Sequence, residues 1–115
     1  MIRRACEMAD EAKCIRGGNG ETLMKKILSG ADEMNGKGRM FNLMTLLPGR
    51  SIGEHTHTGD NEIFYFLSGT GRYNDNGKTV EVAPGDVAVC RDGEIHSLAN
   101  EGSEPLVFIA VILYS

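Results

Sequence analysis

Closely spaced glycine turns divide most of this chain into short segments that favour β structure. From residue 39 onward, apolar and β-branched runs alternate with turn signals such as Pro48-Gly49, Asn76-Gly77 and Pro84-Gly85. The runs are too closely spaced for the helical crossovers that parallel strands need, which take about a dozen residues or more. The pattern therefore predicts an all-β fold of antiparallel strands, either a sandwich or a barrel.

The beginning of the chain is harder to interpret than the rest. Residues 2–15 suit a short helix but lack a clean apolar stripe, and the glycines from Gly17 to Gly20 end whatever precedes them. Residues 22–28 suit a strand, although a helix also fits them, and 29–38 read as a loop. The further predicted strands are 40–47, 51–57, 62–67, 72–73, 79–83, 87–90, 95–99 and 106–114.

Composition restricts the partners and the compartment. The 115 residues are 41% hydrophobic and carry a net charge of −4, so we expect one globular domain that binds neither nucleic acid nor an anionic membrane. The run 106–114 is too short for a transmembrane helix, and no secretory signal is recognisable. Cys6, Cys14 and Cys90 form no C-x-x-C pair, which predicts free thiols and a cytoplasmic protein.

The segment around His55 and His57 carries the clearest chemical signal. Side chains at positions i and i+2 of a strand share one face, whereas on a helix they diverge. Residues 58–61 read as a turn, after which Glu62 begins a returning strand. This arrangement predicts a metal site on a β-hairpin. The alternative is a polar hairpin with two surface histidines.

His96 begins a later predicted strand and taken alone would be a packed or surface residue. Its spacing changes that interpretation. Here the sequence resembles the cupin superfamily, whose first motif is G-x5-H-x-H-x3,4-E-x6-G and whose second is G-x5-P-x-G-x2-H-x3-N. The second motif departs at one position, since Arg91 replaces the proline. The matching residues are Gly49, His55, His57, Glu62 and Gly69, followed by Gly85, Gly93, His96 and Asn100.

The resemblance implies a fold, a ligand set and an assembly. It implies a cupin double-stranded β-helix, or jelly-roll barrel, over residues 39–115, with residues 1–38 as an N-terminal segment joining it. It further implies a homodimer and a likeness to small cupin-2, oxalate-decarboxylase-like proteins. The metal ligands that it implies are His55, His57, Glu62 and His96.

Three nitrogens and one carboxylate oxygen suit a divalent transition metal: Mn, Fe, Co, Ni or Zn. Four ligands on a six-coordinate ion leave two positions open for a small molecule. We therefore expect a metal-dependent enzyme acting on a small oxygen-rich acid or enol, of decarboxylase, isomerase, lyase or dioxygenase type. The alternative is a non-catalytic binding or sensing protein.

The sequence assigns no catalytic acid or base. Several residues are candidates for substrate contact or proton transfer, but each also suits plain packing or a solvated position. Methionines of the predicted strands are expected to fill gaps in the core. The candidates are Arg39 and Arg72 for a carboxylate, Glu54, Tyr65 and Tyr73 for a proton, Phe64 and Phe66 for an apolar wall, and the methionines are Met24, Met40 and Met44.

Overall fold

A computed structural model describes residues 1–115. The chain folds into β-strands, with two short 3-10 helices. Each strand predicted from residue 22 onward is present, with ends that differ by at most a few residues. The strands are β1 (Asp10–Lys13), β2 (Thr22–Leu28), β3 (Gly38–Leu46), β4 (Ser51–Thr56), β5 (Asp60–Ser68), β6 (Gly71–Asp75), β7 (Lys78–Val82), β8 (Val87–Cys90), β9 (Ile95–Ala99) and β10 (Leu106–Tyr114), and the helices are η1 (Ala5–Glu7) and η2 (Ala31–Met34).

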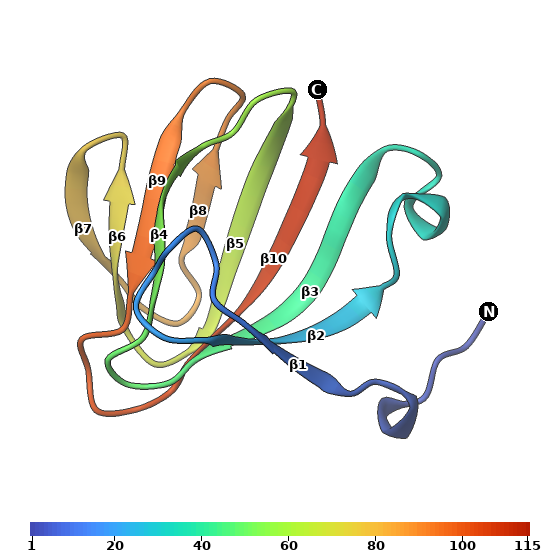
Figure 1. The fold of residues 1–115 in the computed structure, drawn as a ribbon, viewed down its shortest axis with the longest axis horizontal. Coiled ribbons are helices and arrows are strands. Elements are labelled where there is room, and N and C mark those ends of the chain that lie inside the picture. Colours follow the sequence, from blue (N-terminus) through green and yellow to red (C-terminus); the bar gives the residue numbers. More distant parts are fainter.

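Two antiparallel sheets face each other (Figure 1). The larger has the order β1-β2-β3-β10-β5-β8 and the smaller the order β4-β9-β6-β7. Consecutive strands repeatedly change sheet, as β3 to β4 and β4 to β5 do, so segments distant in sequence become neighbours. The predicted all-β class is confirmed. No helix in the structure has the length and apolar character needed to cross a membrane.

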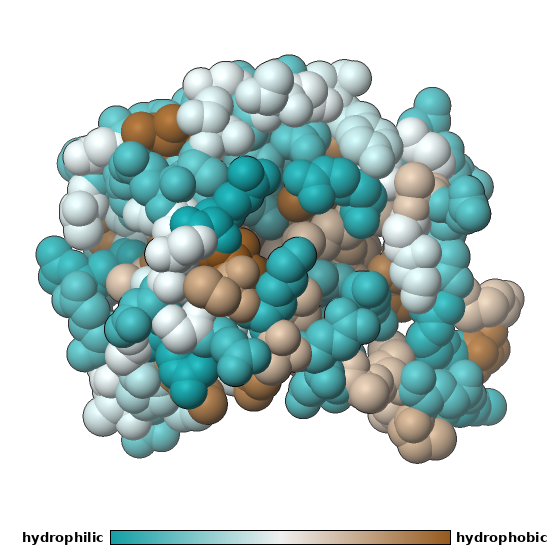
Figure 2. Space-filling model, viewed as in Figure 1, coloured by the Kyte–Doolittle hydropathy of each residue, from teal (hydrophilic) through white to brown (hydrophobic).

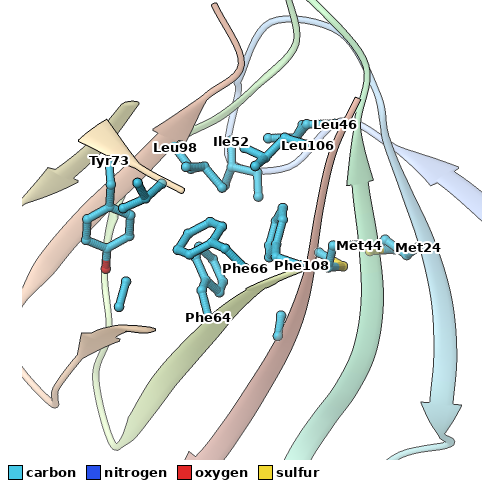
Figure 3. Packing of buried hydrophobic residues seen from close by; sticks show 13 residues of the cluster. Met24, Met44, Leu46, Ile52, Phe64, Phe66, Tyr73, Leu98, Leu106 and Phe108 are labelled. Atoms are coloured by element: carbon cyan, nitrogen blue, oxygen red, sulfur yellow. The ribbon is translucent and has the colours of Figure 1, made fainter. Parts of the chain in front are cut away.

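The core lies between the sheets and is built from alternate residues of each strand. On β5, Phe64 and Phe66 point inward and are buried, while Tyr65 points outward. Phe108 of β10 packs against both phenylalanines, with ring centroids 4.7 and 5.6 Å away (Figure 3). Leu46, Leu98 and Leu106 close one end of this core. The expectation of core packing for Phe64 and Phe66 is confirmed.

The N-terminal segment does not form the short helix that the sequence suggested for residues 2–15. Residues 5–7 form the 3-10 turn η1, and β1 pairs with β2 at the edge of the larger sheet. Every residue of β1 is exposed. A helix here would have no apolar face to bury, whereas an edge strand gains backbone hydrogen bonds. The division at residue 38 stays a prediction, although β1 and β2 share a sheet with β3.

The loop after β1 connects the edges of the two sheets. The carbonyl of Ile15 accepts a hydrogen bond from Gly53 N at 3.1 Å, and that of Asn19 accepts one from Ser51 N at 2.9 Å. A Cβ on Gly18 would lie 2.0 Å from the Ser51 carbonyl oxygen, so only glycine permits this approach. Residues 14–19 thereby form a wall beside β4.

Candidate metal centre

Four side chains with metal-binding atoms converge between the sheets: His55, His57, Glu62 and His96. His55 and His96 come from β4 and β9 of the smaller sheet, with His57 directly after β4, while Glu62 comes from β5 of the larger sheet. The predicted hairpin is therefore wrong, because β4 pairs with β9 and β5 pairs with β10 and β8. The turn between β4 and β5 crosses from one sheet to the other, and the four groups meet from both sides.

The four potential ligand atoms lie close together in a buried position. Nε2 of His57 is 3.1 Å from Oε1 of Glu62 and 3.2 Å from Nε2 of His96. Nε2 of His96 is also 3.1 Å from Nε2 of His55 and 3.1 Å from the same glutamate oxygen. The remaining measured pair, Nε2 of His55 and Oε1 of Glu62, is 4.0 Å apart. No side chain of the four is more than 8% exposed.

Each histidine directs its other ring nitrogen, Nδ1, toward a fixed partner outside the cluster. These contacts hold the rings so that all three Nε2 atoms face inward. The partners are the Gly53 carbonyl oxygen for His55 at 2.7 Å, the Asp60 carboxylate for His57 at 2.7 Å, and the Tyr73 hydroxyl for His96 at 2.8 Å.

These partners decide which ring nitrogen carries the hydrogen. A carbonyl or carboxylate oxygen can only accept, so Nδ1 of His55 and His57 must donate. In the neutral ring, Nε2 then presents a bare lone pair to the centre of the cluster. Bare nitrogens and a carboxylate oxygen about 3 Å apart repel one another unless a positive charge lies between them. The donor set therefore fits a cation.

The spacing of the donor atoms also fits their binding to one shared metal ion. At a metal–ligand distance of about 2.1 Å, neighbouring ligands lie about 3.0 Å apart in an octahedron and about 3.4 Å apart in a tetrahedron. Four of the measured pairs are 3.1–3.2 Å apart, within the range that ligands of one shared ion require. The pair at 4.0 Å is wider, and all four donor atoms lie within 4.8 Å of one another. Where the bound ion takes six ligands, these four side chains would leave two positions for other ligands.

In the metal-free protein, protons on the imidazoles supply part of the positive charge that this cluster needs. Burial alone would raise the pKa of Glu62, but hydrogen bonds from the three histidines outweigh it and hold that pKa well below its usual range. Burial lowers the pKa of His96. The hydrogen bond to Glu62 raises the pKa of His57, against the effect of burial. At neutral pH, Glu62 is a carboxylate and His96 a neutral imidazole, which are the forms that bind metals.

A cavity of about 290 Å³ opens beside the cluster, and His55, His57 and Glu62 form part of its lining. The wall is apolar on the side of β2, β3 and β10 and carries cationic side chains from β3 and the N-terminal segment. In Figure 2, which views the molecule from the side of the N-terminal loop, hydrophobic atoms show between hydrophilic ones near the centre. The apolar wall includes Met24, Met40, Met44 and Ile112, and the cationic residues are Lys13, Arg16 and Arg39.

Several candidates for substrate or proton handling lie outside this cavity. Arg72 is on the smaller sheet and pairs with the exposed Glu101 at 3.5 Å. Glu54 accepts a hydrogen bond from Asn74 at the surface. Tyr65 lies on the outer face of the larger sheet and is 44% exposed. None of these groups reaches the cluster.

The remaining candidates lie at or near the site. Arg39 and Phe64 line the cavity, and Phe64 stacks on the His96 ring with centroids 5.2 Å apart. Tyr73 lies behind His96, where burial above all raises its pKa and keeps the phenol protonated. A neutral hydroxyl of this kind orients the histidine. Its position suits a supporting residue, away from the cavity.

Sequence reasoning missed Asp60 and the contribution of the N-terminal segment. The local sequence predicts a turn at Asp60, yet this residue begins β5, is buried, and accepts hydrogen bonds from His57 and Arg39. Alternation along the strand could have identified it, because side chains two residues apart share a face and Asp60 therefore lies on the same face as Glu62 and Phe64. The cavity also uses the methionines that were expected only to fill the core. They do both, since Met24 and Met44 belong to the buried cluster as well.

Comparison with known proteins identifies the family to which this fold belongs. The family model described as "Cupin domain" matches residues 42–112. This chain therefore belongs to the cupin family. It is 44% identical over 114 residues to a Thermotoga maritima protein named oxalate-binding protein, a match that covers 98% of this chain and 93% of the relative. The expected cupin fold is thereby confirmed.

Solved structures agree with this assignment. The crystal structure of a predicted oxalate decarboxylase from Thermotoga maritima matches with a TM-score of 0.94 and 42% identity, covering 100% of both chains. The polyketide cyclase RemF from Streptomyces resistomycificus matches with a TM-score of 0.78 and 24% identity, over 98% of this chain and 80% of that one. The second likeness concerns the fold alone.

Proposed function

We propose that this protein binds a divalent transition metal through His55, His57, Glu62 and His96. The observation that carries the proposal is the buried convergence of three imidazole nitrogens and one carboxylate oxygen within 4.8 Å of one another. Zinc favours four-coordinate structural sites, whereas Mn, Fe, Co and Ni accept six ligands readily, so we expect one of these four in preference to zinc.

We further propose that the bound metal takes up a small oxygen-rich acid of the oxalate type. The cavity gives such a molecule access to the cluster, and its cationic residues favour an anion. An acid with two oxygens on adjacent carbons can occupy both remaining coordination positions. The relative named oxalate-binding protein supports this class of ligand.

Binding without turnover is the function that the cavity lining supports best. Apart from the proposed metal ligands, the titratable groups in the lining are Lys13, Cys14, Arg16 and Arg39. No further carboxylate or imidazole lies there to move a proton at neutral pH. Catalysis is the second candidate, because a metal with free positions can act as a Lewis acid or bind oxygen.

The test uses purified protein loaded with Mn²⁺, Fe²⁺, Co²⁺ or Ni²⁺ and analysed for metal content. We expect about one metal per chain and calorimetric binding of oxalate to the loaded protein but not to the metal-free protein. Carbon dioxide release and oxygen uptake, followed in the same samples, separate binding from turnover. Failure of every metal to bind or to raise the melting temperature would contradict the proposal.

We propose that the protein forms a homodimer through the outer face of the larger sheet. Val87 is 59% exposed there and lies beside Tyr65. Strand pairing places Ile63 beside Val89 and Ile109 beside Tyr65, so the apolar surface continues across β8, β5 and β10. Two copies of the chain can pack this face against each other around a twofold axis and so bury it. Sedimentation should give a dimer, and Val87→Lys should give a monomer that keeps its metal.

We also propose a cytoplasmic location. Its support is the presence of Cys6, Cys14 and Cys90 as free thiols. Cell fractionation tests it, and recovery of the protein from a secreted or periplasmic fraction would contradict it.

A further inference from the structure

We propose that Arg39 determines which acids the site accepts by binding a second carboxylate on the metal-bound ligand. The inference rests on the proposed function and adds a residue that the cupin motifs do not contain. Four observations carry it: the position of Arg39 in a bulge, its anchoring by Asp60, the free hydrogen-bond donors that this anchoring leaves, and its place in the cavity wall.

The first observation is an irregularity in β3. Opposite β10, Met40 pairs with Ile112 and Gly38 pairs with Leu113, so Arg39 is an extra residue on its strand. In a regular strand it would alternate with Met40, which lines the cavity, and would point away from it. Bulges re-aim side chains and recur next to functional sites. Here the bulge brings the Arg39 side chain to the cavity wall instead.

The second observation is the contact that fixes the guanidinium. Nε of Arg39 donates to Oδ2 of Asp60 at 3.1 Å, while Oδ1 of Asp60 accepts from Nδ1 of His57 at 2.7 Å. The Asp60 side chain is only 8% exposed. One carboxylate thus connects Arg39 to a proposed metal ligand, and the geometry of the arginine is tied to that of the metal centre.

The third observation concerns the donors that remain. Arginine has five N–H groups, and Arg39 uses only the one on Nε within the chain. Its two terminal NH₂ groups lie on a side chain that is 41% exposed and lines the cavity. Such groups donate charge-assisted hydrogen bonds to carboxylate oxygens, including the outer oxygen that a chelating carboxylate keeps free. The arginine is thus anchored on one edge and free on the other.

Other cations do not offer the same arrangement. Lys13 and Arg16 also line the cavity, but both lie in the exposed N-terminal segment and neither has an ion pair that holds it. Arg72, the other arginine considered for a carboxylate, is on the opposite sheet and outside the cavity. Arg39 is therefore the cation with a fixed orientation toward the ligand.

The inference predicts that loss of Arg39 affects two chelating acids differently. Oxalate and pyruvate each offer a carboxylate oxygen and an oxygen on the adjacent carbon. Pyruvate has a methyl group where oxalate has the outer oxygen of its second carboxylate. An arginine that hydrogen-bonds to that outer oxygen should add affinity for oxalate but not for pyruvate. In a site without this contact, the affinity for each acid should depend on metal chelation alone.

The experiment measures metal content and the affinities for oxalate and pyruvate by calorimetry, in metal-loaded wild-type protein and variants. Arg39→Met removes the donors and keeps the aliphatic stem. We expect it to weaken oxalate binding by roughly 10- to 100-fold, the usual worth of charge-assisted hydrogen bonds, and pyruvate binding by no more than about threefold. Arg39→Lys should lie between, because it keeps the charge and loses the planar pair.

Two controls separate this role from charge and from structure. Arg72→Gln removes a charge from outside the cavity, so oxalate affinity should change by less than about threefold. Lys13→Gln removes a charge from the same cavity, and it should weaken oxalate binding clearly less than Arg39→Met does. If Lys13→Gln lost as much oxalate affinity as Arg39→Met, the overall positive charge of the cavity would explain the binding, and the inference would be overturned. Loss of metal from Arg39→Met, in proportion to its loss of oxalate, would show a structural role and also overturn it.

The outcomes distinguish this inference from the proposed function on which it rests. If loaded wild-type protein binds neither acid, the proposed function fails and the role of Arg39 falls with it. If wild-type protein binds oxalate and Arg39→Met binds it equally well, the proposed function stands and only the role of Arg39 is wrong.

Discussion

The two ends of the space between the sheets are built by the same strands and differ in chemistry. On the inner face of β5, successive inward residues are Glu62 in the polar cluster, Phe64 at its border and Phe66 in the apolar core. On β9, His96 is followed two residues later by the buried Leu98. One register therefore positions both ends, and Phe64 joins them by stacking on the His96 ring.

This difference separates stability from function. Burying apolar groups stabilises the fold, whereas burying imidazoles and a carboxylate costs free energy unless their charges are compensated. The apolar end is therefore expected to hold the sheets together, while the polar end depends on a bound cation. Each of the following predictions tests one side of that division.

Truncation in the apolar end should give the largest effect on stability. Phe66 is fully buried and contacts Phe108, so Phe66→Ala removes packing and leaves a cavity. We expect a loss of about 3–5 kcal/mol in the free energy of unfolding, measured by urea denaturation of the metal-free protein. The remaining folded protein should still bind metal, since no polar-end contact is removed.

The matched control for this variant is Leu67→Ala on the same strand. Leu67 lies on the outer face and is 42% exposed, so its truncation should cost much less in monomeric protein. Equal losses in the two variants would contradict an apolar end that is packed as a core.

Removal of a proposed ligand should weaken metal binding strongly and leave the metal-free fold intact, the reverse of the effect expected for Phe66→Ala. His57→Ala takes one donor from the cluster, and we expect metal affinity to fall by about a hundredfold or more, with the metal-free protein still folded. Elemental analysis after gel filtration and circular dichroism measure the two effects. Unchanged metal content would show that the four side chains converge for another reason.

The sequence predicted the convergence of the four proposed ligands better than it predicted their surroundings. His55, His57, Glu62 and His96 were found because they stand at fixed spacings in two short motifs. Their placement was partly wrong, since the motif does not reveal that β4 and β5 lie in different sheets. That arrangement depends on pairing with β9 and β10, which are distant in sequence.

The supporting residues could not be found from local patterns for related reasons. Asp60 resembles a turn residue until β5 is known to begin there. Arg39 would point outward by alternation, and only the bulge opposite β10 re-aims it. The N-terminal segment has little apolar character of its own, so its role in the cavity wall arises from contacts with β4. Long-range pairing decides all three.

A smaller effect should follow from loosening one histidine without removing a ligand. Tyr73→Phe deletes the hydroxyl that lies 2.8 Å from Nδ1 of His96 and leaves the ring in the core. Removing such a partner typically lowers metal affinity by about 10- to 100-fold. Competition with a metal-binding dye measures it, and Tyr65→Phe on the outer face is the control. Equal affinities in Tyr73→Phe and wild-type protein would contradict a supporting role.

The smallest expected effect is a dependence of the metal's stabilisation on pH. Hydrogen bonds to Glu62 and then Asp60 raise the pKa of His57 above its usual 6.5, although burial opposes this. In metal-free protein, the stability that the His57 proton contributes is fully present below pH 6.5 and is lost as the pH rises through the raised pKa.

A metal needs the neutral ring, so protons compete with it most at low pH, by up to about tenfold in affinity per pH unit. His96, whose pKa burial lowers, adds little competition. The rise in melting temperature on adding Mn²⁺ should therefore be several degrees larger at pH 8 than at pH 6. An equal rise at both pH values would mean that no buried proton is displaced, and the polar end would then not be the site where the metal acts.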